Sequence, residues 1–266
     1  MVNFPSSGAG VFRVIGLGSI GLLCLAYALR EAGAIRQLLS SKTTDVFSLT
    51  TGITGPISIS GIATRYEDEL VSPFTGTDCF AFEYEVQERD IRTDSTTDGN
   101  SNTTWEQIDS GHAAVPFLLE DDTGTVLVDP TQVRFGLDTS EKIHVDGGDR
   151  PPAHIQQFIE ADPDVDSEEH TIDLQIFEFK TGDDRRYIER RLEPGETVTV
   201  FGEAQNSPGI STRSGQVNSI ISAGKHPLVL SETTPYRTIL RVYWYVFLVA
   251  VFGVVFLYIA IAPLIA

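Results

Sequence analysis

The feature that most constrains this chain is its last stretch, Val242–Ala266, which carries no charged side chain. As an α-helix, the first ~21 residues of this stretch would measure about 32 Å, close to the roughly 30 Å hydrocarbon core of a bilayer. Tyr243, Trp244 and Tyr245 stand at its start, and amphipathic rings favour the boundary between lipid and water. The sequence therefore predicts a transmembrane helix in the segment 239–266.

A second apolar run covers residues 11–30, "VFRVIGLGSIGLLCLAYALR". Its single interior charge, Arg13, lies near one end, from which a long side chain can reach the interface. A cleaved signal peptide is the alternative, but no small-x-small cleavage site follows the run. We expect an uncleaved transmembrane helix, with Gly18, Ser19 and Gly21 forming a small-residue face against the second helix.

Basic residues flank both apolar runs on the side of the central segment: Arg30, Arg36, Lys42, Arg237 and Arg241. The positive-inside rule then predicts that residues 31–238 are cytoplasmic. The N-terminal tail, residues 1–10, and the C-terminus would lie outside, so the protein would be a two-helix protein of the cell membrane.

The chain as a whole is strongly acidic. It has 37 acidic and 19 basic residues, a net charge of −18, and its few basic residues are mostly arginine. Such a composition is typical of proteins that stay soluble in high salt, and it suggests a halophilic source. It also excludes nucleic acid as an expected partner, because phosphate binding needs a basic face.

The central segment alternates strand patterns with turn signals and predicts a mainly β fold. In residues 79–88, "CFAFEYEVQE", apolar residues alternate with polar ones, so we expect Phe80, Phe82, Tyr84 and Val86 on one face. The expectation is one β-rich domain, sandwich or barrel-like, at 31–238, with one or two short helices.

Further elements follow from the turn chemistry. Residues 117–130 predict a hairpin, 151–161 a helix that begins with two prolines, and 218–232 a closing hairpin. Residues 92–104 are almost entirely polar and predict a flexible loop.

Cys79 is the first candidate for chemistry. A reactive thiol needs a depressed pKa, supplied by a nearby histidine or a helix N-terminus, and no histidine lies close to it in sequence. We expect a buried cysteine at the start of a strand. The two cysteines, Cys24 and Cys79, are too few for a zinc site or a disulfide framework.

Three other patterns resemble sites without their full requirements. Asp122–Gly124 matches the aspartic-protease triplet, but that mechanism needs two carboxylates, and a turn is the expectation. Residues 162–173 place aspartates at calcium-loop positions, with Ser167 where glycine is required. Ser222–Lys225 matches Ser-x-x-Lys but lies between strands. We expect no catalytic residue, no metal and no cofactor.

Several stretches, in order, resemble the GIDE domain, also called the beside-a-membrane domain, of mitochondrial-anchored protein ligases. "SPFTGTDCFAFEYEV" is similar to its Ser-Pro-Leu-Thr-Gly-x-x-Cys strand, "PFLLEDDTGTVLVDP" to its Asp-x-Thr-Gly hairpin, and "YIERRLEPGETVTVFGEA" to its Tyr-x-Glu-x-x-Leu-x-Pro-Gly-Glu stretch. "TTDVFSLTTGITGPISISGIA" and "PLVLSE" resemble its opening and its last strand. The resemblance covers roughly 34–232 and marks these residues as structural motif positions: Ser72, Pro73, Gly76, Cys79, Asp122, Gly124, Glu189, Pro194 and Gly195.

The resemblance implies a relation to E3 ubiquitin ligases, which in eukaryotes carry a RING finger. A RING needs about eight cysteine and histidine zinc ligands, whereas this sequence has two cysteines and five histidines. We therefore expect a RING-less member of haloarchaeal type, without ligase activity.

The resulting expectation is a non-enzymatic, membrane-anchored protein that recognises an unknown protein partner or organises a complex at the membrane surface. An E3-like ligase, a hydrolase that uses Cys79 or Asp122, and a purely structural membrane protein are the alternatives. The mitochondrial proteins hold this domain on the outer side of a membrane, opposite to the charge-based prediction, so its orientation stays open.

Overall fold

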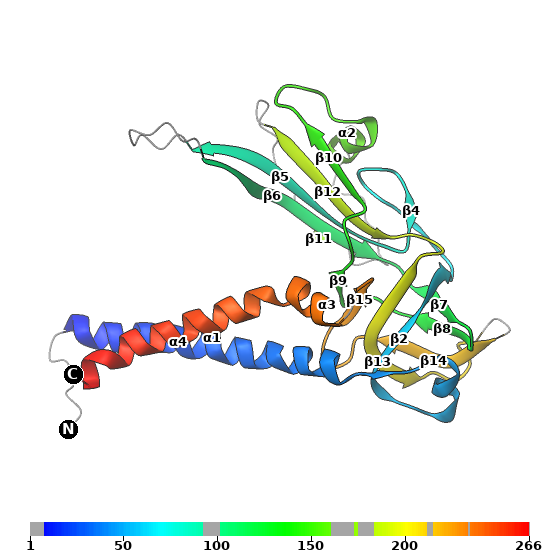
Figure 1. Cartoon of the computed structure of the whole chain (residues 1–266), viewed down its shortest axis with the longest axis horizontal. Helices are drawn as coiled ribbons and strands as arrows, with labels where there is room; N and C mark the ends of the chain where they lie inside the picture. Colours follow the sequence, from blue (N-terminus) through cyan, green and yellow to red (C-terminus); the bar gives the residue numbers. More distant parts are fainter. Residues whose placement is uncertain are drawn as a thin grey trace. The chain divides into compact units, whose positions relative to one another are not determined.

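The computed structural model describes residues 8–92, 102–160, 173–174, 184–211, 215–233 and 235–265. It divides into two compact units (Figure 1). The first, here called the helical hairpin, combines the N-terminal residues up to Ser41 with those from Thr233 onward. The second, here called the β domain, is Lys42–Glu232. The membrane boundaries predicted at 11–30 and 239–266 stay predictions.

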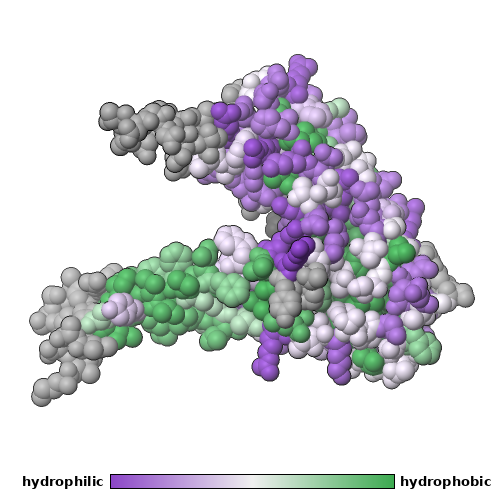
Figure 2. All heavy atoms as spheres, viewed as in Figure 1, coloured by the Kyte–Doolittle hydropathy of each residue, from purple (hydrophilic) through white to green (hydrophobic). Residues whose placement is uncertain are grey.

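The helical hairpin contains two long apolar helices that pack against each other (Figures 1 and 2). Two segments, Val14–Ser40 with 27 residues and Trp244–Ala262 with 19, are long and apolar enough to cross a membrane, and 17% of an 18-residue apolar window in each is buried. So little burial distinguishes them from the core helices of a soluble protein. The helices are α1 (Gly8–Ser40), α3 (Pro235–Val242) and α4 (Trp244–Ile265).

Small residues bring α1 and α4 together. A Cβ placed on Gly21 would lie 2.8 Å from the Leu257 Cγ and 2.9 Å from the Gly253 carbonyl oxygen, and one on Gly18 would lie 3.8 Å from the Ala260 Cβ. The predicted roles of Gly18 and Gly21 are thus confirmed. Ser19 was assigned wrongly, because its exposed hydroxyl bonds the carbonyl of its own helix at position 16.

Five strands of the β domain close into a barrel. Their order is β2-β7-β8-β14-β13, and β13 pairs with β2 to complete the circle. Closure removes exposed strand edges. The mainly β, barrel-like class predicted from the sequence is confirmed. The barrel strands are β2 (Gly55–Arg65), β7 (Phe117–Asp121), β8 (Gly124–Val128), β14 (Gln216–Ser222) and β13 (Thr197–Asn206).

Three strands extend this sheet, and the predicted hairpin at 117–130 is present, with Asp121 opposite Gly124. A short 3₁₀ helix, η1, precedes β2. These elements are β1 (Lys42–Thr43), η1 (Phe47–Thr51), β9 (Val133–Gly136) and β15 (Leu228–Ser231).

The predicted closing hairpin at 218–232 is wrong. Strands β14 and β15 do not pair with each other; each pairs with a different half of β13. Strand β13 changes partner at Gly202, where a Cβ would lie 2.8 Å from the Ile221 Cγ2. The absence of a side chain lets both strands approach the same edge of β13.

A second, five-stranded sheet runs in the order β10-β12-β5-β6-β11, and α2 packs on one of its faces. The helix predicted at 151–161 corresponds to α2. Most of the loop predicted at 92–104 lies outside the described residues. The elements are β3 (Leu70–Val71), β4 (Asp78–Cys79), β5 (Ala81–Arg92), β6 (Asn102–Ala114), β10 (Glu141–Val145), α2 (Ala153–Glu160), β11 (Asp173–Leu174) and β12 (Arg185–Leu192).

Each sheet has its own core. Phe82, Tyr84 and Val86 lie in the core beneath α2, as their alternation predicts. Phe80 instead belongs to the barrel core, where it stacks on Phe117 with ring centroids 5.8 Å apart. The chain bends at Phe80, so a single face for all four residues was wrong.

Candidate functional site

The Ser72–Thr77 turn is built around the side chain of its first residue. The Ser72 N–H donates to the Thr77 carbonyl at 2.9 Å, and the Gly76 N–H donates to the Ser72 carbonyl at 3.0 Å. The Ser72 hydroxyl then accepts from the Thr77 N–H at 3.0 Å and contacts the Thr75 hydroxyl at 2.7 Å. The motif serine therefore closes the turn and is itself buried.

Gly76 meets two demands that only glycine satisfies. Its φ is +69°, in the left-handed region that is costly for other residues. A Cβ there would also lie 2.5 Å from the His154 Cε1 on α2. The turn and the helix are thus in contact at this residue. His154 reaches the motif turn here, a proximity that the sequence did not reveal.

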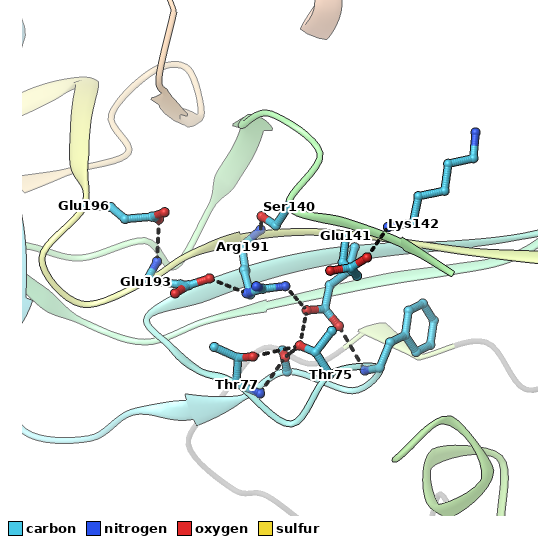
Figure 3. A network of polar contacts seen from close by, with 11 residues as sticks. Thr75, Thr77, Ser140, Glu141, Lys142, Arg191, Glu193 and Glu196 are labelled. Carbon is cyan, nitrogen blue, oxygen red and sulfur yellow. Dashed lines mark hydrogen bonds and ion pairs between the residues drawn. The ribbon is translucent and has the colours of Figure 1, made fainter. Parts of the chain in front are cut away.

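Glu189, on β12, is fully buried beneath the turn. Its carboxylate accepts from the Phe74 N–H at 2.9 Å, the Thr75 hydroxyl at 2.9 Å and the Arg191 Nη1 at 2.9 Å. These three donors compensate the cost of burying the charge. We call this set, with Ser72, Thr77 and Glu193, the Glu189 network; Figure 3 shows Thr75 and Thr77 facing Arg191 and Glu193.

Arg191 joins two carboxylates, since its Nε also donates to the Glu193 Oε1 at 2.7 Å. Burial alone would lower the pKa of Arg191, but the hydrogen bonds to Glu189 and Glu193 outweigh it and raise that pKa. The guanidinium therefore stays charged. Its position fixes the strand to the turn that follows.

That following turn, at Pro194 and Gly195, connects β12 to the barrel strand β13. Gly195 has a φ of +88°, and the Glu193 N–H donates to the Glu196 Oε2 at 2.7 Å. The turn also contacts β2, because the Gly195 N–H donates to the Ala63 carbonyl at 2.8 Å. The Pro-Gly-Glu stretch therefore links the two sheets.

Cys79 is fully buried in the core beneath α2. Burial, and after it the charge of Glu189, raise the pKa of its thiol to about 12. A thiol with this pKa is protonated at neutral pH and is a poor nucleophile. The geometry therefore gives no support to a hydrolase that uses Cys79.

At the β7–β8 turn the bracing side chain is Asp121, one residue before the Asp122 singled out from the sequence. The Asp121 carboxylate accepts from the Thr123 N–H at 2.7 Å, the Gly124 N–H at 3.0 Å and the Val46 N–H at 2.8 Å. Burial raises its pKa, but a hydrogen bond from the Thr123 hydroxyl at 2.6 Å and these three N–H bonds outweigh burial and lower it overall. Asp122 is exposed.

The remaining sequence patterns do not form sites among the described residues. Ser222 ends β14, where its hydroxyl accepts from the Gln205 Nε2 at 3.1 Å, while the Lys225 N–H donates to the Glu203 Oε1 at 3.1 Å. The calcium-like residues 162–172 lie outside the described residues.

In the part of the chain that the structure describes, one group could hold a metal by distance alone: His144, Asp146 and Asp184 offer atoms within 4.8 Å of one another. However, one Asp184 oxygen pairs with Arg89, and the other accepts from the Gly147 N–H at 2.9 Å. Both oxygens are thus already engaged, and we assign no metal to this group.

An aromatic and cationic pair, in which both side chains are half-buried, lies on the face of the five-stranded sheet opposite α2. The Arg186 guanidinium lies 3.6 Å from the centroid of a Trp105 ring, and the His144 ring centroid lies 5.7 Å from Trp105. Among the described residues no carboxylate pairs with Arg186. Other arginines of this sheet have acidic partners: Arg89, Arg185, Arg190 and Arg191.

Sequence reasoning found Ser72, Gly76 and Glu189 only as motif positions, and it missed Thr75, Arg191, Glu196 and Asp121. A signal existed for three of these, since Thr75, Asp121 and Glu196 stand in the quoted Ser-Pro-Leu-Thr-Gly, Asp-x-Thr-Gly and Pro-Gly-Glu patterns.

Comparison with protein families matches residues 84–254, more than half of the chain, to the model of the GIDE family, described as E3 ubiquitin ligase. The matched segment includes Glu189 and the turn at Gly195, and it begins after the Ser72–Thr77 turn. In the same comparisons no curated protein and no solved structure matches.

Proposed function

Because this chain belongs to the GIDE family, we propose that it is a membrane-anchored protein that recognises a protein partner without catalysing a reaction itself. The observation that carries this proposal is that the motif residues stabilise the fold. The polar groups of the Glu189 network bond one another and hold a turn, a strand and the link between two sheets. Such saturated groups are suited to a scaffold.

Anchoring at both ends supports a role at the membrane surface. The β domain is continuous in sequence with one apolar helix before it and another after it. Two spanning helices would keep the domain next to the bilayer, where a low-affinity contact gains from high effective concentration. The protein partner would then be a membrane protein or one that visits the same surface.

The Trp105–Arg186 pair is the contact surface that we favour for this partner. Tryptophan and arginine are enriched among the residues that dominate binding energy at protein interfaces. Stacking holds the guanidinium in one orientation, so less side-chain freedom would be lost on binding.

An E3-ligase role is the second candidate, favoured by the description of the matching family. Ubiquitin transfer by the RING route would need zinc ligands that these 266 residues do not supply, with two cysteines and five histidines. In that case the present domain would select the substrate of a ligase whose zinc module lies outside these residues.

We further propose that the protein is a haloarchaeal type of GIDE protein, from its acidic composition. Salt screens the repulsion among its carboxylates, with a Debye length of about 3 Å at 1 M against about 10 Å at 0.1 M. Urea midpoints of the β domain should therefore rise steadily with KCl. Midpoints that fall or stay constant would contradict adaptation to high salt.

The cytoplasmic orientation of the β domain is part of this proposal. Trypsin added to intact cells should leave the segment 92–104 uncut, although Arg92 offers a cleavage site. Cleavage from outside would place the domain on the outer side instead. A membrane-permeabilised sample is the control, and there the same site should be cut.

Partner recognition is tested by affinity purification from solubilised membranes. We expect a reproducible protein partner with the wild-type chain, reduced at least ten-fold by Trp105→Ala, since hot-spot truncation costs about 2 kcal/mol or more. The control is Phe47→Ala, which truncates an exposed aromatic side chain. Phe135→Ala would be unsuitable, because Phe135 is buried. Recovery of no reproducible partner would contradict the recognition role.

A further inference from the structure

Helix α3 and the start of α4 present one exposed stripe. Arg237, Leu240, Arg241 and Trp244 are exposed. Trp244 begins α4, but the Tyr243 N–H donates to the Ile239 carbonyl at 2.9 Å and continues the helical path from α3, so the spacing of three and four residues places the four side chains on one face. The intervening residues Thr238, Ile239 and Tyr243 are buried. The stripe therefore faces outward from the helical hairpin and mixes two cations with two large apolar side chains.

The packing of α1 against α4 shows which part of α1 lies level with this stripe. Gly18 is opposite Ala260, and Gly21 is opposite Leu257, so the antiparallel pairing advances residue for residue. At a rise of 1.5 Å per residue on both helices, continuing this register places Trp244 level with about Ala34. The exposed Arg36 then lies level with the stripe.

Charge is distributed unevenly between the two units. The helical hairpin has five arginines and a single acidic residue, Glu31, a net charge of +4. Glu31 is buried, whereas Arg36, Arg237 and Arg241 are exposed. We call these three the arginine collar. Exposed cations beside an exposed tryptophan match the chemistry of the headgroup region.

We propose that the arginine collar binds the phosphate groups of anionic phospholipids, while Leu240 and Trp244 enter the boundary between headgroups and acyl chains. The inference rests on the proposed membrane anchoring. A guanidinium forms paired hydrogen bonds with phosphate oxygens, and a juxtamembrane cation attracts anionic lipid by about 1 kcal/mol. The collar would thus select anionic lipids around α3 and the C-terminal end of α1.

Tryptophan fluorescence allows a direct test, because the chain has two tryptophans. Trp105→Phe leaves Trp244, within the stripe, as the sole reporter. The full-length W105F protein is reconstituted in phosphatidylcholine vesicles, at a KCl concentration where its circular dichroism shows folded protein. Brominated phosphatidylglycerol or brominated phosphatidylcholine is then added as a quencher at equal mole fraction, and vesicle flotation confirms insertion.

Each collar arginine should raise the preference for phosphatidylglycerol over phosphatidylcholine near Trp244 roughly five-fold, which corresponds to about 1 kcal/mol per cation. Arg237→Gln with Arg241→Gln should reduce the preference roughly thirty-fold. The matched control, Arg150→Gln with Lys225→Gln, removes two exposed cations of the β domain and should leave it unchanged. Arg237→Gln alone provides a milder variant, with a five-fold reduction.

Equal quenching by the two lipids in the W105F protein with all collar arginines intact would overturn the collar proposal while leaving membrane anchoring intact. A preference that survives the double arginine variant would also overturn it, since other residues would then select the lipid. Failure of the protein to float with vesicles, together with no quenching by either lipid, would instead overturn the proposed anchoring and the collar with it.

Discussion

The helical hairpin and the β domain differ in how they manage charge. The hairpin has five basic residues and one acidic residue, a net charge of +4, so the β domain, with the other 14 basic and 36 acidic residues, has −22. The hairpin packs through glycines and has little to neutralise. The β domain buries a carboxylate, Glu189, and surrounds it with donors. One region therefore depends on close backbone approach, and the other on a complete polar network.

The largest effect should come from Glu189→Ala. Removing this carboxylate leaves the Phe74 N–H without its acceptor and Arg191 without one of its two partners, and breaking a buried pair costs about 3–5 kcal/mol. Urea unfolding of the full-length protein in lipid nanodiscs, followed by circular dichroism of the β domain, measures the free energy of unfolding.

Glu141→Ala is the matched control for that experiment, since Glu141 pairs directly opposite Glu189 in register but is exposed. It should change stability by less than about 0.5 kcal/mol. A loss below 1 kcal/mol for Glu189→Ala would mean that the network is not what stabilises the β domain.

In the helical hairpin, steric overlap at a glycine should cause the loss of stability. Gly21→Leu forces a side chain against Leu257 and the Gly253 carbonyl, and overpacking costs about 1–3 kcal/mol. Gly16→Leu is the control, because a Cβ there meets nothing within 4 Å. Helix content during detergent titration with SDS reports hairpin stability, and equal midpoints for the two variants would refute the glycine contact.

Gly76→Ala should destabilise the β domain by about 1–2 kcal/mol from its left-handed φ alone, with a further loss from displacing His154. Gly148→Ala separates the two causes, because Gly148 has a φ of +87° but open space around it. The same urea experiment should show a smaller loss for Gly148. Equal losses would show that the contact between turn and helix adds nothing.

The smallest effect concerns pH. Hydrogen bonds lower the pKa of Asp121 in the folded state, so its contribution is present above the unfolded pKa of about 3.9 and is lost as pH falls through the folded value. Asp121→Asn should lower the free energy of unfolding by about 1 kcal/mol at pH 7. This difference from the wild type, the stability gap, should shrink below about pH 4. Exposed Asp122→Asn should show no gap at either pH.

The sequence predicted the elements with strong local signals. The hairpin at 117–130 has turn residues at its tip, and the helix at 151–161 has prolines at its start, so neighbouring residues alone determined both. The apolar helices were equally clear from length and hydropathy. The closing hairpin at 218–232 failed because its two strands lie one after the other along the same edge of β13 and pair with that earlier strand instead of with each other.

The Glu189 network could not be predicted for a different reason. Alternation in β12 places Tyr187, Glu189 and Arg191 on one face, but a glutamate in a strand is normally exposed. Besides Arg191, the donors that make its burial possible come from the Ser72–Thr77 turn, more than a hundred residues earlier. Contacts of this range leave no periodic signal in one sequence.

We propose that the β domain recognises a partner and does no chemistry with Cys79 or Asp122. The most direct measurement compares partner recovery, from cross-linked membranes, by the wild-type chain and by a Cys79→Ala/Asp122→Asn double variant. Both proteins should recover the same partner in the same amount. Loss of the partner's modification or turnover with the double variant, while binding persists, would contradict it and identify an enzyme.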